Sequence, residues 1–272
     1  MRNDITKRAL AGEKFNDLHI VDAHCHMGTY YNFYFPKADI EEMIQDADIL
    51  GVEKVCIAPH TAISCDYKLG NRQLQEAIDK YPDRVYGMLT LNPNYPEEFD
   101  AQFESYYHIK QFTGIKLHNG LHNYPITGEN CHKLFEKLRL SGGYVLAHTW
   151  EGSQTCSIPM CEDIIRSYPD IAFILGHSGG LSKSVAMSAE VVNKYENAYL
   201  DTSGFEYSDT WIEEIAGKAD GTKILFGSDY PFHDIRGGIS RILLAALDDD
   251  VKIRILSSNF NDLLKRYTKL IK

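Results

Sequence analysis

The sequence predicts a single α/β domain, a (β/α)8 TIM barrel, over residues 1–272. Short β-branched apolar runs alternate with helical patterns along the chain, and such alternation builds a parallel sheet. Eight of these units fit into the chain, which favours closure of the sheet into a barrel. Histidines recur at the ends of the expected strands, where a barrel forms its active site.

The expected strands recur roughly every 30 residues, the size of one βαβ step. They are residues 18–23, 54–58, 84–91, 113–117, 144–147, 172–175, 198–201 and 224–227. Apolar residues at i, i+3 and i+4 predict helices between them, for example over 40–50, 71–81, 131–140 and 182–195. Residues 1–16 are expected to form an N-terminal extension, and residues 250–272 to form C-terminal helices.

An open, doubly wound sheet is the main alternative fold. Such a sheet usually carries a glycine-rich phosphate loop after its first strand. Here the first strand runs into Asp22-Ala23-His24-Cys25-His26, and neither G-x-G-x-x-G nor G-x-x-x-x-G-K-S/T occurs in a suitable place. The barrel is therefore the preferred interpretation.

Charge and composition restrict the expected partners. The 28 Lys and Arg residues against 38 Asp and Glu give a net charge of −10, which disfavours nucleic acid and anionic membrane surfaces. No apolar run approaches the roughly 20 residues of a membrane span, and residues 1–16 contain no signal-like apolar region. The six cysteines have no C-x-x-C spacing, so we expect reduced thiols in the cytoplasm, with Cys156 and Cys161 unbridged.

Histidines mark one end of the expected barrel. Because the carboxyl ends of barrel strands converge on one face, histidines at those ends should meet there. A single histidine in such a place is often a strand cap, but six together favour a functional site. The six are His24, His26, His60, His118, His148 and His177.

His24 and His26 lie two apart on the first strand. Side chains alternate across a strand, so both imidazoles should point to the same side. Such a pair is half of a metal site. Asp22 shares this parity, and we expect it to accept a hydrogen bond that orients an imidazole.

His148, His177 and Asp229 each follow an apolar run. A buried, unpaired Asp229 would be costly, and a neighbouring cation would remove that cost. The alternative roles for Asp229 are a helix N-cap or an ion pair with Lys116. Imidazoles with one carboxylate suit Zn²⁺ best, with Mn²⁺, Fe²⁺, Co²⁺ or Ni²⁺ as alternatives.

Five motifs together resemble a known family. They are H-C-H at 24–26, G-I-K-L-H at 114–118, L-A-H-T at 146–149, L-G-H-S-G-G at 175–180 and F-G-S-D-Y-P at 226–231. In this order they resemble the amidohydrolase superfamily, in particular its "amidohydrolase 2" branch of hydrolases, lactonases and aromatic-acid decarboxylases. The resemblance extends from about residue 18 to residue 264 and is specific for the superfamily rather than for a substrate.

The resemblance implies a role for each of these residues. Asp229 would also handle a proton, and His177 would either help to activate water or bind a second metal ion. Lys116 would bridge two ions if carboxylated; the favoured interpretation is one ion, with Lys116 as an anion anchor or a partner of Asp229. The implied metal ligands are His24, His26, His148 and Asp229, with His177 in the two-metal case.

The resemblance also implies a reaction. A bound cation would activate water for hydrolysis of a small-molecule amide, ester or lactone, with Asp229, His177 and Lys116 as catalytic residues. The alternative is decarboxylation of an aromatic or enoic acid. A metal-binding barrel without catalytic activity is a third interpretation, disfavoured because the full set of residues is present.

Aromatic residues dominate the loop after the first strand, from Tyr30 to Phe35. The loop is expected to be a lid that contacts a ring or an apolar acyl group, with Tyr31 as a substrate-binding residue. The alternatives are a homodimer contact or packing onto a neighbouring loop. His60, His118 and Arg236 lie on other strand-end loops and suggest a substrate that carries a carboxylate. His122 and His233 are equally consistent with surface positions.

Overall fold

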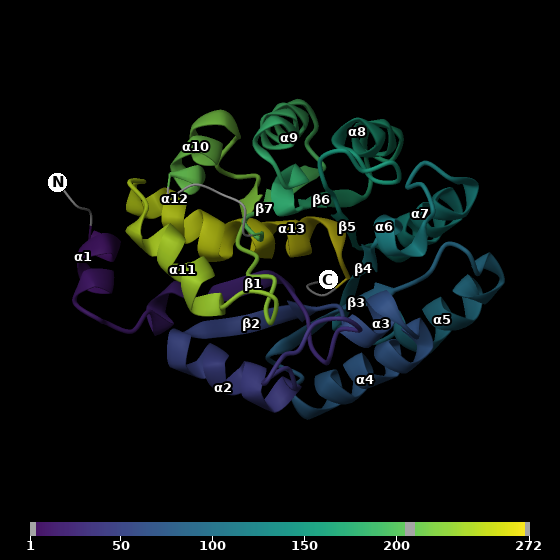
Figure 1. Ribbon diagram of the computed structural model, residues 1–272, viewed down its shortest axis with the longest axis horizontal. Helices are drawn as coiled ribbons and strands as arrows, with labels where there is room; N and C mark the ends of the chain where they lie inside the picture. The colour runs from purple at the N-terminus through teal and green to yellow at the C-terminus, as the bar shows by residue number, and fades with distance from the viewer. Residues whose placement is uncertain (1–3, 205–209, 270–272) are drawn as a thin grey trace.

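The computed structural model describes residues 4–204 and 210–269, and within them eight parallel strands follow one another in sequence order around a barrel (Figure 1). The predicted fold is confirmed. Each strand pairs with the next one along the chain, so every connection is a crossover on the outside. The strands are β1 Ile20–Cys25, β2 Val52–Ile57, β3 Val85–Thr90, β4 Phe112–Leu117, β5 Tyr144–His148, β6 Ala172–Gly176, β7 Ala198–Asp201 and β8 Ile224–Leu225.

The barrel closes where the segment that follows β8 pairs with β1. The backbone N–H of Ala23 donates to the Phe226 carbonyl at 2.9 Å, and Asp229 N–H donates to the His24 carbonyl at 2.8 Å. These bonds continue the ladder although β8 itself is only two residues long. They also place Asp229 directly beside His24 and His26, the pair predicted to bind a metal.

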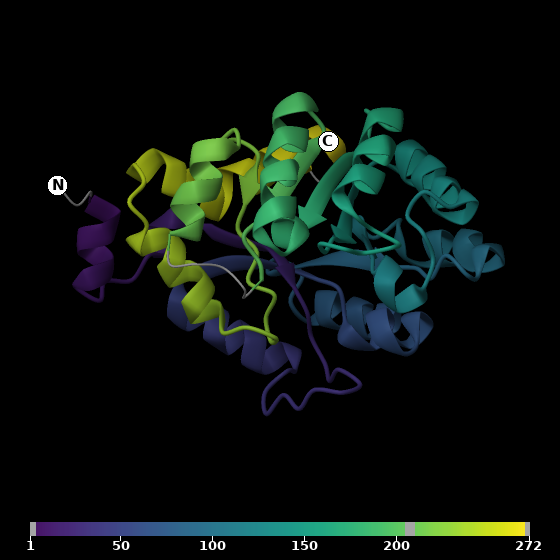
Figure 2. The same cartoon turned by 45° about the horizontal axis from the view of Figure 1, so that its top comes forward.

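Helices cover the outside of the strands and alternate with them along the chain (Figures 1 and 2). The predicted helix 40–50 matches α2, which Asp39 caps by accepting from Glu42 N–H at 2.8 Å and which ends at the left-handed Gly51. The helices are α1 Asp4–Leu10, α2 Ile40–Leu50, α3 His60–Ser64, α4 Tyr67–Lys80, α5 Phe99–Tyr106, α6 Asn119–His122, α7 Glu129–Ser141, α8 Ile158–Ser167, α9 Ser182–Lys194, α10 Trp211–Lys218, α11 Ile235–Leu244, α12 Asp249–Ile253 and α13 Asn259–Tyr267.

The first strand begins and ends two residues later than predicted. Leu18 belongs to a short 3₁₀ turn, and His19 then adopts a left-handed conformation with φ 50°, so extended pairing starts at Ile20. As a result His24 lies within the strand and His26 immediately follows it. Both histidines are buried, because the strand places them inside the barrel wall.

The amino end of the barrel is closed by α13. Phe260 of this helix lies edge to face against Tyr144, the first residue of β5, with ring centroids 5.6 Å apart. Tyr267 contacts Tyr199 of β7 in the same way at 6.5 Å. With this end filled by aromatic packing, the opposite, carboxyl end is left for a site.

Two chain-wide expectations can also be compared with the structure. Within residues 4–204 and 210–269, the helices are all too short or too polar to span a bilayer. The six cysteines are free thiols; Cys156 and Cys161 are buried with their sulfur atoms 3.6 Å apart and are not bridged.

Candidate metal centre and active site

A cavity of about 570 Å³ opens at the carboxyl end of the barrel. Its lining comes from the ends of most strands, as expected for a barrel whose loops build the site. The lining residues are His26, Tyr30, Phe33, Phe35, His60, Ile63, Lys116, His118, His148, Trp150, His177, Gly204, Asp229, Phe232 and His233. Most of the predicted site residues therefore face one space.

His24 lies at the floor of the site, fully buried between a carboxylate and an ammonium group. Its Nδ1 lies 2.6 Å from Asp201 Oδ2, and a carboxylate can only accept, so Nδ1 carries the ring proton. The lone pair of Nε2 then points toward the site, where it accepts from Lys116 Nζ at 2.7 Å. His24 is thus fixed in the tautomer that a metal ligand requires.

His26 and Asp229 face each other across the same floor. His26 Nδ1 donates to the Ala58 carbonyl at 2.7 Å, which leaves Nε2 as an acceptor 3.1 Å from Asp229 Oδ1. The same Asp229 oxygen lies 3.7 Å from His24 Nε2. Acceptors at such distances repel unless a proton or a cation lies between them. Asp229 is held there in a left-handed backbone conformation with φ 60°.

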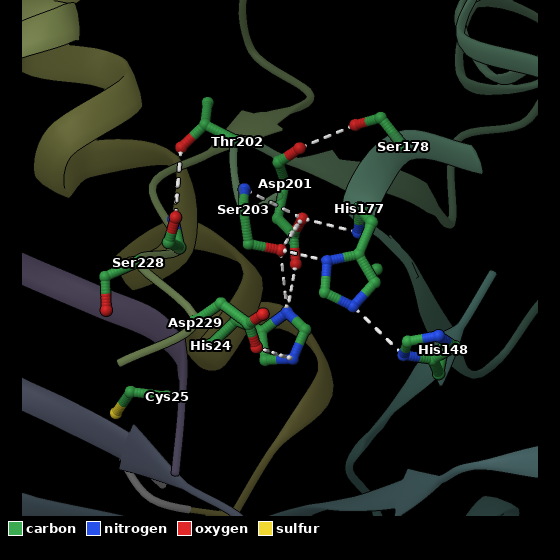
Figure 3. A network of polar contacts seen from close by, with 12 residues as sticks. His24, Cys25, His148, His177, Ser178, Asp201, Thr202, Ser203, Ser228 and Asp229 are labelled. Carbon is green, nitrogen blue, oxygen red and sulfur yellow. Dashed lines mark hydrogen bonds and ion pairs between the residues drawn. The ribbon is translucent and has the colours of Figure 1, made fainter. Parts of the chain in front are cut away.

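His148 and His177 form the other side of the floor (Figure 3). His177 Nε2 lies 3.0 Å from His148 Nδ1. The Ser203 hydroxyl lies between two rings, 3.0 Å from His177 Nδ1 and 3.1 Å from His24 Nδ1. Asp201 anchors this arrangement, because its Oδ1 accepts from the Ser203 hydroxyl at 2.7 Å and from His177 N–H at 2.8 Å.

These donors have the spacing of a metal centre. One atom each from His24, His177 and Asp229 falls within 4.8 Å of the others. Ligands of a tetrahedral zinc ion are about 3.4 Å apart, given metal–ligand distances of about 2.1 Å. The separations of 3.1 and 3.7 Å from Asp229 to His26 and His24 bracket that value. The donor set therefore fits a divalent cation.

Burial keeps the imidazoles in their neutral, ligand-competent form. It lowers the pKa of His26 to about 3, and it holds the pKa values of His24, His148 and His177 well below the usual 6.5. Burial also raises the pKa of the Asp229 carboxyl and lowers that of the Lys116 ammonium beside it. A bound cation would favour the ionised form of Asp229.

Aromatic rings form the upper wall of the cavity. The Phe232 ring contacts three other rings of this wall. Its centroid lies 5.0 Å from that of Tyr30, 5.3 Å from that of Phe33 and 5.1 Å from that of Phe35. His60 lies under this wall, stacked on His26 at 4.8 Å, and its burial lowers its pKa to about 2. The wall side of the cavity is consequently largely apolar.

The predicted substrate-binding residues fall in two groups. His60 and His118 line the cavity, with His118 stacked on His148 at a centroid distance of 3.9 Å. Tyr31 is 63% exposed and lies outside the lining. Arg236 lies in α11, pairs with Asp234 and keeps 75% of its side chain exposed, also away from the cavity.

The expectation that Asp22 orients an imidazole is wrong. Its carboxylate accepts from the backbone N–H of His24 at 3.1 Å and from the backbone N–H of Ser228 at 3.0 Å. These bonds tie β1 to the segment after β8. The imidazole of His24 is oriented from the opposite side, by Asp201.

Asp201 and Ser203 were not singled out from the sequence. The available signal was an acidic residue at the end of an apolar strand, the same signal that pointed to Asp229. Asp201 is fully buried and Ser203 is 1% exposed, so both belong to the interior of the site. Their role follows only from contacts with residues far away in the chain.

Fold and site together define a barrel protein with a candidate metal centre at the face where barrel enzymes carry out their chemistry. A family model described as amidohydrolase matches residues 21–265, and the chain belongs to this family. The resemblance found in the motifs is thereby confirmed. Among curated proteins, none matches the chain in sequence.

Solved structures resemble the barrel over most of its length. A 2,6-dihydroxybenzoate decarboxylase complexed with 2,6-dihydroxybenzoate has a TM-score of 0.72 at 15% identity, covering 90% of this chain and 98% of that one. A dihydroxybenzoic acid decarboxylase from Polaromonas, with bound manganese and 2-nitroresorcinol, has 0.69 at 16%, covering 90% and 96%. A probable 2-pyrone-4,6-dicarboxylic acid hydrolase from Acinetobacter baumannii has 0.66 at 16%, covering 91% and 99%. At these identities the likeness concerns the fold.

Proposed function

We propose that the protein is a metal-dependent decarboxylase of a small carboxylic acid with a flat, unsaturated body. The observation that supports this proposal best is the cavity itself, which joins a histidine–aspartate floor to a wall of aromatic rings. An aromatic or conjugated acid can place its carboxylate toward the floor and pack its body against these rings, and aromatic contacts favour this. Two of the structural neighbours named above are decarboxylases of dihydroxybenzoic acids.

We assign the metal to the floor of this cavity. When bound there, a divalent cation would polarise a substrate oxygen and stabilise developing negative charge. Imidazole and carboxylate donors suit Zn²⁺, and the manganese in one structural neighbour adds Mn²⁺ as a candidate. One ion is favoured, with Lys116 as an uncarboxylated anion anchor, because lysines paired with carboxylates are common in such sites. The assigned ligands are His24, His26, His148 and Asp229, as the family resemblance implies for one ion; His177, which lies in the close set with His24 and Asp229, is assigned to proton transfer instead.

Lys116 supplies the positive charge for the substrate. The lone pair of His24 Nε2 can serve either a cation or the ammonium group of Lys116, 2.7 Å away. In the loaded site Lys116 therefore turns to another acceptor, and a substrate carboxylate is the acceptor that the cavity admits. This accounts for a buried lysine at the end of β4, which is 1% exposed.

His177 and Asp229 handle the proton. In decarboxylation the bond between the substrate carbon and its carboxyl group breaks, the electron pair stays on that carbon, and carbon dioxide leaves. A proton must then reach the carbon. The Ser203 hydroxyl donates to Asp201, so it accepts from His177 Nδ1 at 3.0 Å, and Nε2 of the neutral ring is the nitrogen that can take up a proton. His177 therefore delivers the proton only after it has taken one up from solvent on Nε2, and Asp229 is the neighbouring carboxyl that can pass a proton on in the same way.

Hydrolysis is the second candidate reaction, and the same pair of residues supports it. Asp229 and His177 flank the floor on two sides and are placed to accept a proton from water. The family description and the pyrone-dicarboxylate hydrolase among the neighbours agree with this chemistry. Sequence motifs alone favour hydrolysis, whereas the apolar wall favours decarboxylation.

We also propose that the protein works in the cytoplasm. The free thiols at all six cysteines support this location.

A single assay separates these reactions. Metal-loaded protein is incubated in ¹⁸O-water with aromatic and enoic acids, lactones, esters and amides, and both carbon dioxide and ¹⁸O in the products are measured. We expect carbon dioxide release without ¹⁸O in the remaining acid-derived product, and loss of turnover in Asp229→Asn. Incorporation of ¹⁸O without carbon dioxide would establish hydrolysis instead. Stoichiometric metal with no turnover on the whole panel would support a metal-binding barrel without catalytic activity.

A further inference from the structure

His60 carries a buried hydrogen-bond acceptor that is left unused. The side chain is fully buried yet lines the cavity. Its Nδ1 lies 2.9 Å from the Gly28 carbonyl, which can only accept, so the ring proton of neutral His60 is on Nδ1. Its Nε2 has no hydrogen-bond partner among residues 4–204 and 210–269. Buried polar atoms are nearly always paired, so this lone pair calls for an explanation.

The ring is held in place by neighbours that offer no hydrogen bond to it. It stacks between His26 at 4.8 Å and Phe35 at 5.4 Å, with Phe232 at 4.8 Å and Tyr30 at 5.2 Å against it edge to face. Rotation of the ring to find another partner would break the bond to Gly28 and disturb this stack. The acceptor therefore stays fixed, next to a metal ligand.

We propose that His60 is a specificity-determining residue, whose Nε2 accepts a hydrogen bond from a hydroxyl or N–H group on the body of the substrate. Of the polar groups that line the cavity, His60 offers an acceptor, whereas Lys116 offers only donors. A substrate that satisfies both carries a carboxylate for Lys116 and, elsewhere on its body, a hydroxyl or N–H group for His60. An analogue without that donor leaves Nε2 unpaired and is discriminated against.

This assignment rests on the proposed function only in that the cavity receives a small acid. It is tested by binding, which needs no turnover. The probes are 2-, 3- and 4-hydroxybenzoate, each with its methoxy analogue and with unsubstituted benzoate as reference. Dissociation constants are measured by calorimetry on the manganese-loaded protein and on the metal-free protein. The variants are His60→Phe, which keeps a ring in the stack, His60→Gln, which keeps an acceptor, and His108→Phe as a control at an exposed histidine.

We expect at least one hydroxybenzoate to bind the wild type about 10- to 100-fold more tightly than its methoxy analogue. His60→Phe should abolish this preference, His60→Gln should retain part of it, and His108→Phe should leave it unchanged. If none of the hydroxybenzoates is preferred or bound, or if the preference survives in His60→Phe, the assignment of His60 is overturned. Should His60→Phe fail to fold, the partial preference in His60→Gln decides the question.

The same experiment keeps the two proposals apart. A preference for the hydroxyl group that depends on His60, together with no release of carbon dioxide, would leave the role of His60 intact and overturn decarboxylation. Carbon dioxide release with equal affinity for hydroxy and methoxy analogues would do the reverse.

Discussion

Replacing Asp201 with asparagine tests how the metal centre is held. Asp201 Oδ1 accepts from the backbone N–H of His177 at 2.8 Å and from the Ser203 hydroxyl at 2.7 Å. With two donors on that side, the amide oxygen of an asparagine must take the Oδ1 position. The amide nitrogen then replaces Oδ2, 2.6 Å from His24 Nδ1, and donates where the carboxylate accepted.

The expected effect is a change of tautomer rather than of fold. His24 would have to accept at Nδ1 and carry its proton on Nε2, the nitrogen that faces the metal site. Loss of the acceptor behind a ligating imidazole typically costs 10- to 100-fold in metal affinity. Since each tenfold corresponds to about 1.4 kcal/mol, the expected loss in Asp201→Asn is about 1.4 to 2.8 kcal/mol of binding free energy.

The assay is a metal titration against a competing chelator, for Zn²⁺ and Mn²⁺ separately, with thermal melting as a check on the fold. Asp22→Asn is the matched control, because Asp22 is also fully buried but accepts from backbone N–H groups and from the Ser228 hydroxyl instead of an imidazole. It should bind metal as the wild type does. Equal affinity in the wild type and in a folded Asp201→Asn would refute the reasoning.

Four further predictions concern the ligand His24, the chemical state of Lys116, the aromatic loop and the pH dependence of stability. His24→Ala should lose most of its metal content by elemental analysis and its activity, and full retention of metal would contradict its assignment as a ligand. If Lys116 is carboxylated, anomalous scattering should reveal two metal peaks about 3.5 to 4 Å apart; the free ammonium predicts one peak. Tyr31 and Phe33, both more than half exposed, are replaced together by alanine: lower turnover at constant mass supports a lid, and a shift in mass at constant turnover supports a dimer contact. For pH, burial lowers the pKa of His60 to about 2, below the roughly 6.5 of the unfolded chain, so the unfolded state binds more protons in between. As the pH is lowered from 6.5, the free energy of unfolding of the metal-free protein should therefore decrease, and His60 should contribute up to about 1.4 kcal/mol of this decrease per pH unit. Urea titrations at several pH values should show that the unfolding free energy of His60→Phe depends less steeply on pH than that of the wild type.

Local sequence signals were sufficient for the barrel. The β-branched apolar runs of the strands and the helical spacing between them are patterns of a few residues, so they are readable without neighbours. The same holds for His24 and His26, whose alternation on one strand places both in the site. Where a signal depended on backbone conformation, as at His19 with its φ of 50°, the predicted start of the strand was displaced by two residues.

The partners of these residues were not readable in this way. Asp22 is two residues from His24 and shares its parity, yet the carboxylate on the imidazole is Asp201, which lies 177 positions further along the chain. Arg236 follows a strand end like the true lining residues, but α11 turns it toward Asp234 and solvent. Parity and spacing specify a side of an element, and they do not specify what lies opposite.

The sequence by itself therefore determined an eight-stranded barrel and a set of histidines with Asp229 at its carboxyl end, because strand and helix periodicity are local properties of the chain. Only the tertiary structure decided which ring nitrogen each histidine offers. That choice depends on single acceptors, Asp201 for His24 and the carbonyls of Ala58 and Gly28 for His26 and His60, brought into contact when the barrel closes. Hydrogen bonds act over about 3 Å, so their partners are fixed by packing and not by distance along the sequence.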